Sequence, residues 1–284
     1  MTTPLGRAAL SLYLLVVAAN ADAALHDNFE IRTTAGVASA DYDAPLAYAA
    51  GQLTELLQID GKDLPFLTVV ISQTSAEREA YVAADLAQPY LLLSEDLLQK
   101  KQGQHATLAD VVAHEACHLW LIELAEQHGI AQRKQMIPQY GHSEFNDWFD
   151  EMVAVSCEGS KLQQQRTTTA FTPIPMAQFL TQVHPVYAQL QARIAAAVAA
   201  RKQDGEQGQS VIKLTVDNSD FARYYKQSAH FYQFLRAQQP DLSAVEWFNL
   251  ATLDDAEHIA QQLGFKSLAA LERSFIEFVQ SSAL

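Results

Sequence analysis

The stretch of the chain that most restricts how it can fold is VVAHEACHLW, residues 111–120. It places His114 and His118 four residues apart, and Glu115 directly follows the first histidine. On an α-helix, residues four apart point in nearly the same direction, so the two imidazoles can bind one metal ion. The flanking segments are apolar, and a buried helix with two histidines and a glutamate needs partners for them. The stretch therefore predicts a buried helix with a zinc site on one face, since imidazole nitrogen is an ordinary zinc ligand.

A catalytic zinc ion needs a third protein ligand. One class of zincins takes it from a histidine six residues after the second one, but Leu124 stands at that position. Another class uses a glutamate from a following helix, and the segment WFDEMVAVSCEG (148–159) supplies Glu151. Glu158 lies seven residues further on, which puts it on the same face of the expected helix. There it is expected to hydrogen-bond a ligating histidine.

Glu115 is expected to take part in the chemistry and not to bind the metal. It is one residue from His114 and therefore about 100° around the helix axis, beside the metal-binding face but not on it. A carboxylate in that place can accept a proton from a water molecule at the metal, which is the role of a general base. The alternative is a chance match to the motif, which is rare in a chain with nine histidines.

The N-terminus has the three features of a secretory signal peptide, in their usual order. Arg7 precedes an apolar run over residues 8–19, and two patterns of alanine, any residue, alanine follow within residues 19–23. We expect residues 1–23 to be a signal peptide, cleaved at one of these patterns, and the mature protein to be exported, either periplasmic or secreted. The apolar run is too short to span a bilayer comfortably, so stable membrane insertion is not expected. The alternative is a buried N-terminal helix.

The charge balance argues against one class of partner. The chain has 33 acidic and 19 basic residues, a formal net charge of −14. Such a surface repels phosphate backbones and anionic lipid headgroups, so no nucleic acid partner is expected. The simplest interpretation of the acidity is solubility.

The order of apolar patterns predicts an α+β fold in two lobes. Residues 24–105 contain two apolar segments typical of strands, at 64–72 and 89–98, with helical spacing before and between them. The second segment begins behind a proline, which suits the edge of a sheet. Residues 106–284 form a mostly helical lobe that contains the zinc-binding residues. The expected helices are 43–59, 74–86, 107–128 (capped by Thr107), 146–162, 176–202 (with Pro185 as an alternative break) and several in 220–284. A short strand is expected at 211–216.

The chain has two cysteines, Cys117 and Cys157. In an oxidising compartment such a pair can form a disulfide. Each lies in one of the two helical segments expected to hold metal ligands, so a bridge between them is geometrically conceivable. The alternative is two buried free thiols, because helical cysteines often simply pack in a core.

Several of these segments together resemble a known family, the gluzincin zinc metallopeptidases, and within it the peptidase MA-like proteins related to the M1 aminopeptidases. H-E-x-x-H at residues 114–118 matches the first family motif. Residues 148–154 are similar to the W-x-x-E-x-x-A segment of the family, and residues 225–228 (YKQS) to a later helix that carries a tyrosine. The likeness covers most of the mature chain.

The resemblance implies a zincin-like, two-lobe metalloprotease fold and a set of site residues. One Zn²⁺ ion per chain would be bound by His114, His118 and Glu151. Glu115 would be the general base, and Tyr225 would stabilise the oxyanion of the reaction. The neighbouring tyrosine, residue 224, is the alternative oxyanion donor.

The expected function is that of an exported zinc-dependent peptidase, which hydrolyses bonds in a peptide or protein substrate with an activated water. The edge strand near residues 90–93 would align the substrate as an added strand. The main alternative is a non-catalytic zincin-like protein that binds a peptide or protein partner in its cleft, and the presence of Glu115 argues against it. A weaker alternative is a zinc hydrolase that acts on a non-peptide amide. His142 is expected to be a surface loop residue and not a ligand.

Overall fold

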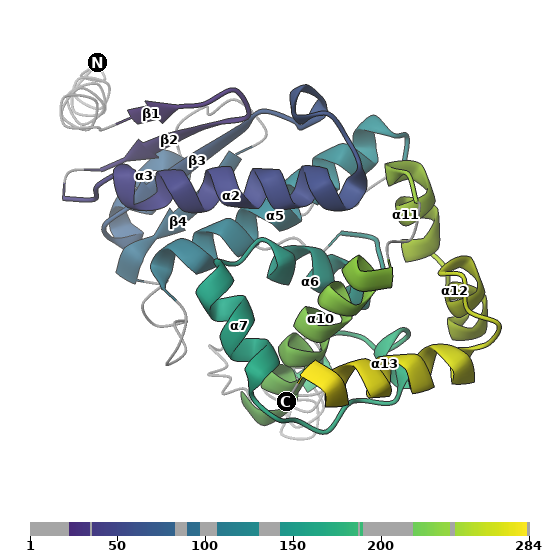
Figure 1. Ribbon diagram of the computed structural model, residues 1–284. Coiled ribbons are helices and arrows are strands. Elements are labelled where there is room, and N and C mark those ends of the chain that lie inside the picture. Colours follow the sequence, from purple (N-terminus) through teal and green to yellow (C-terminus); the bar gives the residue numbers. More distant parts are fainter. Residues whose placement is uncertain are drawn as a thin grey trace, which may run out of the picture.

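The computed structural model describes residues 23–34, 36–82, 90–96, 107–130, 143–186, 188–189, 218–238 and 242–282. Within these ranges the protein is a mixed α/β molecule that is mostly helical and has one small sheet (Figure 1). Most of the expected signal peptide, the expected strand at 211–216 and the loop residue His142 lie outside the described residues.

The sheet has four strands in the order β1-β2-β3-β4. They are β1 (Ala23–Leu25), β2 (Phe29–Thr33), β3 (Leu67–Ser72) and β4 (Tyr90–Ser94). β2, β3 and β4 are parallel, and β1 is antiparallel to β2. The expected strands correspond to β3 and β4, and β4 does lie at an edge of the sheet. The expectation missed β1 and β2, although β2 alternates buried and more exposed residues in the manner of a strand with one solvated face.

β3 is buried along its whole length because apolar residues cover both of its faces. Val69 and Ile71 belong to the main core, whereas Val70 lies on the opposite face with Tyr90 and Leu92 of β4. β-branched residues suit such a position, since they pack well on a pleated surface. The face of the sheet that carries Val69 and Ile71 therefore packs against the helices in the main core.

Two long helices, α2 (Ala40–Leu57) and α5 (Leu108–Gln127), pack against each other next to the sheet (Figure 1). α5 begins as expected, because Thr107 forms a capping box with Asp110. Trp120 in the middle of α5 is fully buried, and its indole N–H donates a hydrogen bond to the carbonyl of Pro65 at 2.9 Å. α5 is thus fixed to the sheet side of the molecule.

The prediction of one helix over residues 146–162 is wrong. The chain forms α6 (Asp147–Ser156), turns, and continues as α7 (Ser160–Thr168). The break has a packing cause at Gly159, whose N–H donates a hydrogen bond to Oδ1 of Asp110 at 3.0 Å. A Cβ atom on Gly159 would lie 2.6 Å from that oxygen, so any other residue there would require the carboxylate of Asp110 to shift. Glu158 therefore lies in the turn and does not share a helix face with Glu151.

The described part of the C-terminal third, residues 218–238 and 242–282, is mostly helical, as expected. Of its helices, α10 (Asn218–Gln238) packs directly against both α6 and α7, and α13 packs against α10 (Figure 1). Among the described helices, none is both long enough and apolar enough to cross a bilayer. The remaining elements are α3 (Ser75–Val82), the short 3₁₀ helix η1 (Gly61–Asp63), α8 (Met176–Phe179), α10 (Asn218–Gln238), α11 (Ala244–Ala251), α12 (Ala256–Gln262) and α13 (Leu268–Ser282).

Candidate metal centre

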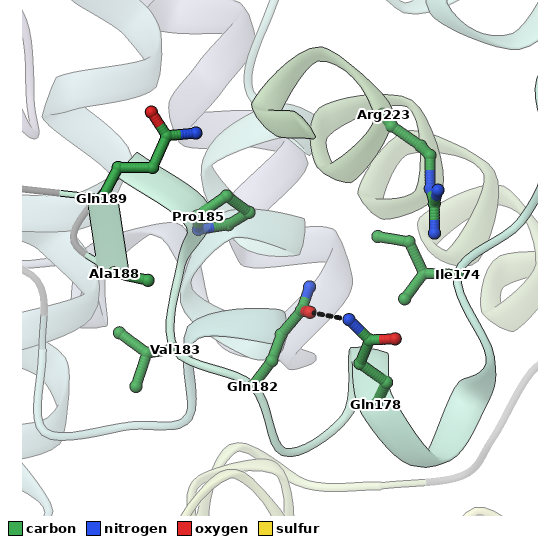
Figure 2. A pocket seen from close by; sticks show the side chains of 8 residues that line it. All are labelled: Ile174, Gln178, Gln182, Val183, Pro185, Ala188, Gln189 and Arg223. Carbon is green, nitrogen blue, oxygen red and sulfur yellow. Dashed lines mark hydrogen bonds between the residues drawn. The ribbon is translucent and has the colours of Figure 1, made fainter. Parts of the chain in front are cut away.

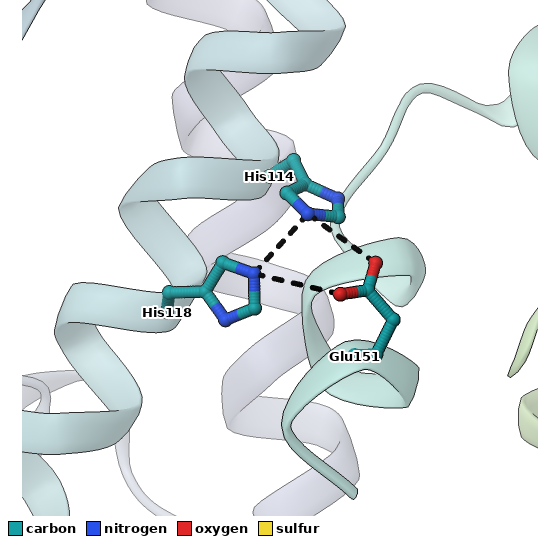
Figure 3. A group of neighbouring side chains, drawn as sticks. All are labelled: His114, His118 and Glu151. Carbon is teal, nitrogen blue, oxygen red and sulfur yellow. Dashed lines mark hydrogen bonds and ion pairs between the residues drawn. The ribbon is translucent and has the colours of Figure 1, made fainter. Parts of the chain in front are cut away.

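Three side chains from two helices converge in the interior (Figure 3). His114 and His118 come from consecutive turns of α5, and Glu151 comes from α6. The two Nε2 atoms are 3.1 Å apart. Oε1 of Glu151 lies 3.4 Å from Nε2 of His114, and Oε2 lies 4.0 Å from Nε2 of His118. All three side chains are buried, and they form a group that can hold a metal ion.

The hydrogen bonds on the far side of each imidazole orient the inner nitrogens. Nδ1 of His114 donates to Oε1 of Glu158 at 3.2 Å, and Nδ1 of His118 donates to Oδ1 of Asp150 at 2.8 Å. In each neutral ring Nε2 then carries a lone pair that points toward the other ring and toward Glu151. Oε1 of Glu151 is buried and accepts no hydrogen bond. Lone pairs and a carboxylate that face one another need a cation between them, so the donor set fits a metal ion.

The carboxylates behind the histidines are themselves fixed. Arg166 on α7 donates to both oxygens of Glu158, at 2.6 and 2.7 Å. Oδ2 of Asp150 accepts the backbone N–H of Ser143 at 2.9 Å. Burial alone would raise the pKa of Glu158, but the guanidinium of Arg166 lowers it below its ordinary value. Glu158 therefore stays ionised and continues to accept the proton of His114.

The contact between Glu158 and a histidine was expected from the sequence. The contacts that Asp150 and Arg166 make in the same region were missed. Asp150 stands directly before Glu151, and the rule that a ligating histidine has a carboxylate behind it could have identified it. No pattern in the sequence pointed to Arg166, because its partner is selected by the turn at Gly159 and the direction of α7.

The pKa of His114 reflects the concentration of negative charge around it. Burial by itself would lower this pKa, but the carboxylates of Glu151, Glu158 and Glu115 together raise it to about 9. Without a metal ion, the cation in the cluster at neutral pH is therefore a proton on His114. A metal ion has to displace that proton, because only neutral imidazole is a ligand.

Metal binding should therefore be pH-dependent. The folded-state pKa of His114 is above the ordinary value of 6.5, so its proton stabilises the metal-free fold fully below pH 6.5 and that contribution is lost as the pH rises through about 9. Since Zn²⁺ competes with this proton, its affinity should rise about tenfold per pH unit from pH 7 toward 9 and level off above. Calorimetric titration of Zn²⁺ in two buffers of different ionisation enthalpy should count about one proton released per ion at pH 7. An affinity that is the same at pH 7 and pH 8.5 would contradict the assignment.

The structure also brings Tyr225, one of the two expected catalytic residues, to the cluster. The ring centre of Tyr225, on α10, lies 5.9 Å from that of His114, and the guanidinium of Arg166 lies 4.9 Å from the ring centre of Tyr225. Burial raises the pKa of Tyr225 well above its ordinary value, and the charges of Glu151 and Glu115 add to this effect. The phenol therefore stays protonated as a hydrogen-bond donor.

The neighbouring Tyr224 is placed differently. It is fully buried in the core, where its ring packs against Phe179 and His184, and its hydroxyl makes no hydrogen bond. A side chain with no exposed surface cannot meet a substrate directly. Between the two tyrosines, the geometry favours Tyr225 as the one that can act on a bound molecule.

A third buried histidine, His184, lies at the cluster and was missed from the sequence. It follows α8, and its Nε2 is 3.7 Å from Oε2 of Glu151. The sequence gives no local signal for it, since it stands alone before Pro185 in a segment expected to be helical.

Cys117 and Cys157 form a disulfide, which decides between the two alternatives left open by the sequence. Cys117 precedes His118 on α5, and Cys157 directly follows α6, so the bond joins the two helices that carry the candidate metal ligands. The bond closes a loop with a sequence separation of 40 residues. The loss of chain entropy in the unfolded state then stabilises the fold by about 4 kcal/mol.

A pocket of about 420 Å³ lies near the centre but includes none of its ligands (Figure 2). Its wall combines aliphatic side chains with three glutamines and one arginine. Two of its residues flank His184 in sequence, and its arginine stands two residues before Tyr225 on α10. The lining residues are Ile174, Gln178, Gln182, Val183, Pro185, Ala188, Gln189 and Arg223.

Comparisons of the chain with protein-family models, with curated proteins and with solved structures found no match. The function therefore has to be argued from the chemistry of the cluster and from the motifs in the sequence.

Proposed function

We propose that the protein is an exported zinc-dependent peptidase of the gluzincin type, with a zincin-like fold. One zinc ion per chain would be bound by His114, His118 and Glu151. The observation that carries the proposal is the convergence of two imidazole Nε2 atoms and a carboxylate, with a further carboxylate behind each ring. Two histidines and one glutamate are the donor set of a catalytic zinc site, which keeps a further position open for water or substrate.

The mechanism follows from the side chains around the cluster. When bound, zinc polarises a carbonyl group and lowers the pKa of water. Glu115 accepts the proton of the attacking water and passes it to the nitrogen of the leaving group. Tyr225 donates its O–H to the oxygen that becomes negative as the carbonyl is attacked. Glu158 and Asp150 keep the two histidines in the tautomer whose Nε2 is free to bind metal.

The sheet supports a peptide or protein substrate. Among the described strands, β4 (Tyr90–Ser94) is an outermost strand of the sheet, although its five residues are buried and a peptide would have to uncover them first. An extended peptide can pair with such an edge through its main chain, which suits a peptide or protein substrate. The net charge of −14 supports the expectation that nucleic acid is not the partner.

Export is supported by one feature of the structure. The disulfide between Cys117 and Cys157 is typical of proteins that work in an oxidising compartment. The first strand, β1, begins at Ala23. Cleavage after Ala21 would leave this strand whole, whereas cleavage after Ala23 would remove its first residue. We therefore favour the first of the two cleavage patterns.

The proposal is tested by incubating the purified mature chain, loaded with Zn²⁺, with a diverse peptide library. Cleavage is expected, and it should stop when a chelator removes the metal and return when Zn²⁺ is added back. Mass spectrometry of the products reports the bonds that are cut. If the zinc-loaded protein retains peptides without cutting any, the non-catalytic binding alternative is correct. If it hydrolyses only simple amides, it is an amidase and not a peptidase.

A further inference from the structure

The two oxygens of Glu151 have different surroundings (Figure 3). Oε1 is 3.4 Å from Nε2 of His114 and accepts no hydrogen bond. Oε2 is 4.0 Å from Nε2 of His118 and 3.7 Å from Nε2 of His184. Oε1 thus lies near one histidine, His114, whereas Oε2 lies near two histidines, His118 and His184.

The hydrogen bonds of His184 set its tautomer. Its Nδ1 accepts a hydrogen bond from the backbone N–H of Val186 at 3.3 Å. The neutral ring therefore carries its proton on Nε2, the atom that faces Glu151. This arrangement is the reverse of that in His114 and His118, whose protons point outward and whose Nε2 lone pairs point inward. His184 thus has an N–H group on the nitrogen nearest Glu151. His114 and His118 have a lone pair on the corresponding nitrogen, which can bind a metal ion.

The position of His184 is fixed by the helix that carries Glu151. The backbone N–H of His184 donates to Oδ2 of Asp147 at 2.7 Å, and Asp147 lies one turn before Glu151 on α6. The ring centres of Tyr224 and Tyr225 lie 5.1 and 5.6 Å from that of His184, both edge-on. His184 is 2% exposed. The imidazole is thus held on several sides, and its Nε2 lies 3.7 Å from Oε2 of Glu151, an electrostatic contact that is longer than a hydrogen bond.

We propose that His184 is a positioning residue, which holds Glu151 through Oε2 and leaves Oε1 to face the metal ion. The proposal rests on the proposed metal centre. Its competitor is that His184 is a fourth protein ligand, which would make the site closed and structural rather than catalytic. Among the described residues, the group whose ligand atoms lie within 4.8 Å of one another consists of His114, His118 and Glu151, and His184 is outside it.

The test compares two substitutions of His184 with one control. His184→Phe keeps an aromatic ring but has no donor, whereas His184→Gln can donate an amide N–H from a similar position. His230→Phe is the control, because His230 is another 2% exposed histidine, stacks on Phe171 and is not part of the group of possible ligands among the described residues. The dissociation constant for Zn²⁺ is measured by competition with a coloured chelator. X-ray absorption counts the imidazoles that bind each zinc ion.

A positioning role predicts that His184→Phe weakens Zn²⁺ binding 10- to 100-fold, the usual effect of losing a partner behind a metal ligand. His184→Gln should stay within a few-fold of the parent protein, and His230→Phe should not change. Two imidazoles per zinc ion are expected in the parent protein and in every variant.

Two outcomes would overturn the role of His184. One is unchanged Zn²⁺ affinity in His184→Phe, and the other is three imidazoles per zinc ion in the parent protein, a measurement that needs no variant to fold. Failure of the proposed metal centre has a different signature. In that case His118→Ala binds Zn²⁺ as tightly as the parent protein, and the positioning role falls with the site.

Discussion

Replacing Glu115 by glutamine is expected to lower peptide hydrolysis about 10²-fold or more, while the protein keeps one zinc ion per chain. Glutamine retains the shape of glutamate and can form hydrogen bonds, but it cannot accept the proton of the attacking water. Zinc should stay bound because Glu115 is outside the group of metal-binding atoms, although its charge acts on His114 and Tyr225. The substitution therefore separates catalysis from metal binding.

The measurement is single-turnover cleavage of a peptide that the parent protein cuts, together with metal analysis of each variant. Glu126→Gln is a matched control, since Glu126 is a partly buried glutamate three turns further along α5. It should cut the peptide at the parent rate. Full activity in Glu115→Gln would refute the proposed base, whereas loss of zinc in this variant would mean that Glu115 is a ligand.

Replacing His118 by alanine is expected to abolish stable metal binding. The substitution removes one of three protein ligands, and it leaves the buried carboxylate of Asp150 without the imidazole that donates to it at 2.8 Å. The loss of affinity should exceed about 100-fold, which is the upper range for removing a partner that only supports a ligand. After dialysis against a weak chelator, elemental analysis should find zinc in the parent protein and essentially none in the variant.

His128→Ala is the control for this substitution, because His128 is an exposed histidine at the C-terminal end of the same helix. Its zinc content should equal that of the parent protein. If His118→Ala retains a full equivalent of zinc, the assignment of ligands is wrong. If both variants lose zinc, the effect reflects damage to α5 and not the loss of a ligand.

The part of the site that lies within one helix could be predicted from the sequence. The spacing of His114 and His118 determines their common direction, because backbone geometry sets the relation of residues four apart. The cap at Thr107 and the buried strand β3 are local features of the same kind. Glu151 was expected from its place in the following helical segment as well as from the resemblance to a family, and the structure brings it together with the two histidines.

The missed features depend on contacts between segments far apart in the chain. Helical periodicity cannot show that Gly159 packs against Asp110, 49 residues earlier, and so it extended α6 through the turn. The break sends α7 in a new direction, which brings Arg166 to Glu158. His184 reaches the centre because Asp147 of α6 holds its backbone N–H. None of these contacts has a periodic signature.

The sequence by itself determined the arrangement of His114 and His118, since the spacing of two histidines within one helix is enough to point both imidazoles at one place. The tertiary structure alone decided what surrounds them. It joined Cys117 to Cys157, placed Asp150 behind His118, and brought Nε2 of His184 to within 3.7 Å of Glu151. The physical reason is that helix geometry acts over a few residues, whereas buried polar groups must find hydrogen-bond partners wherever packing brings them.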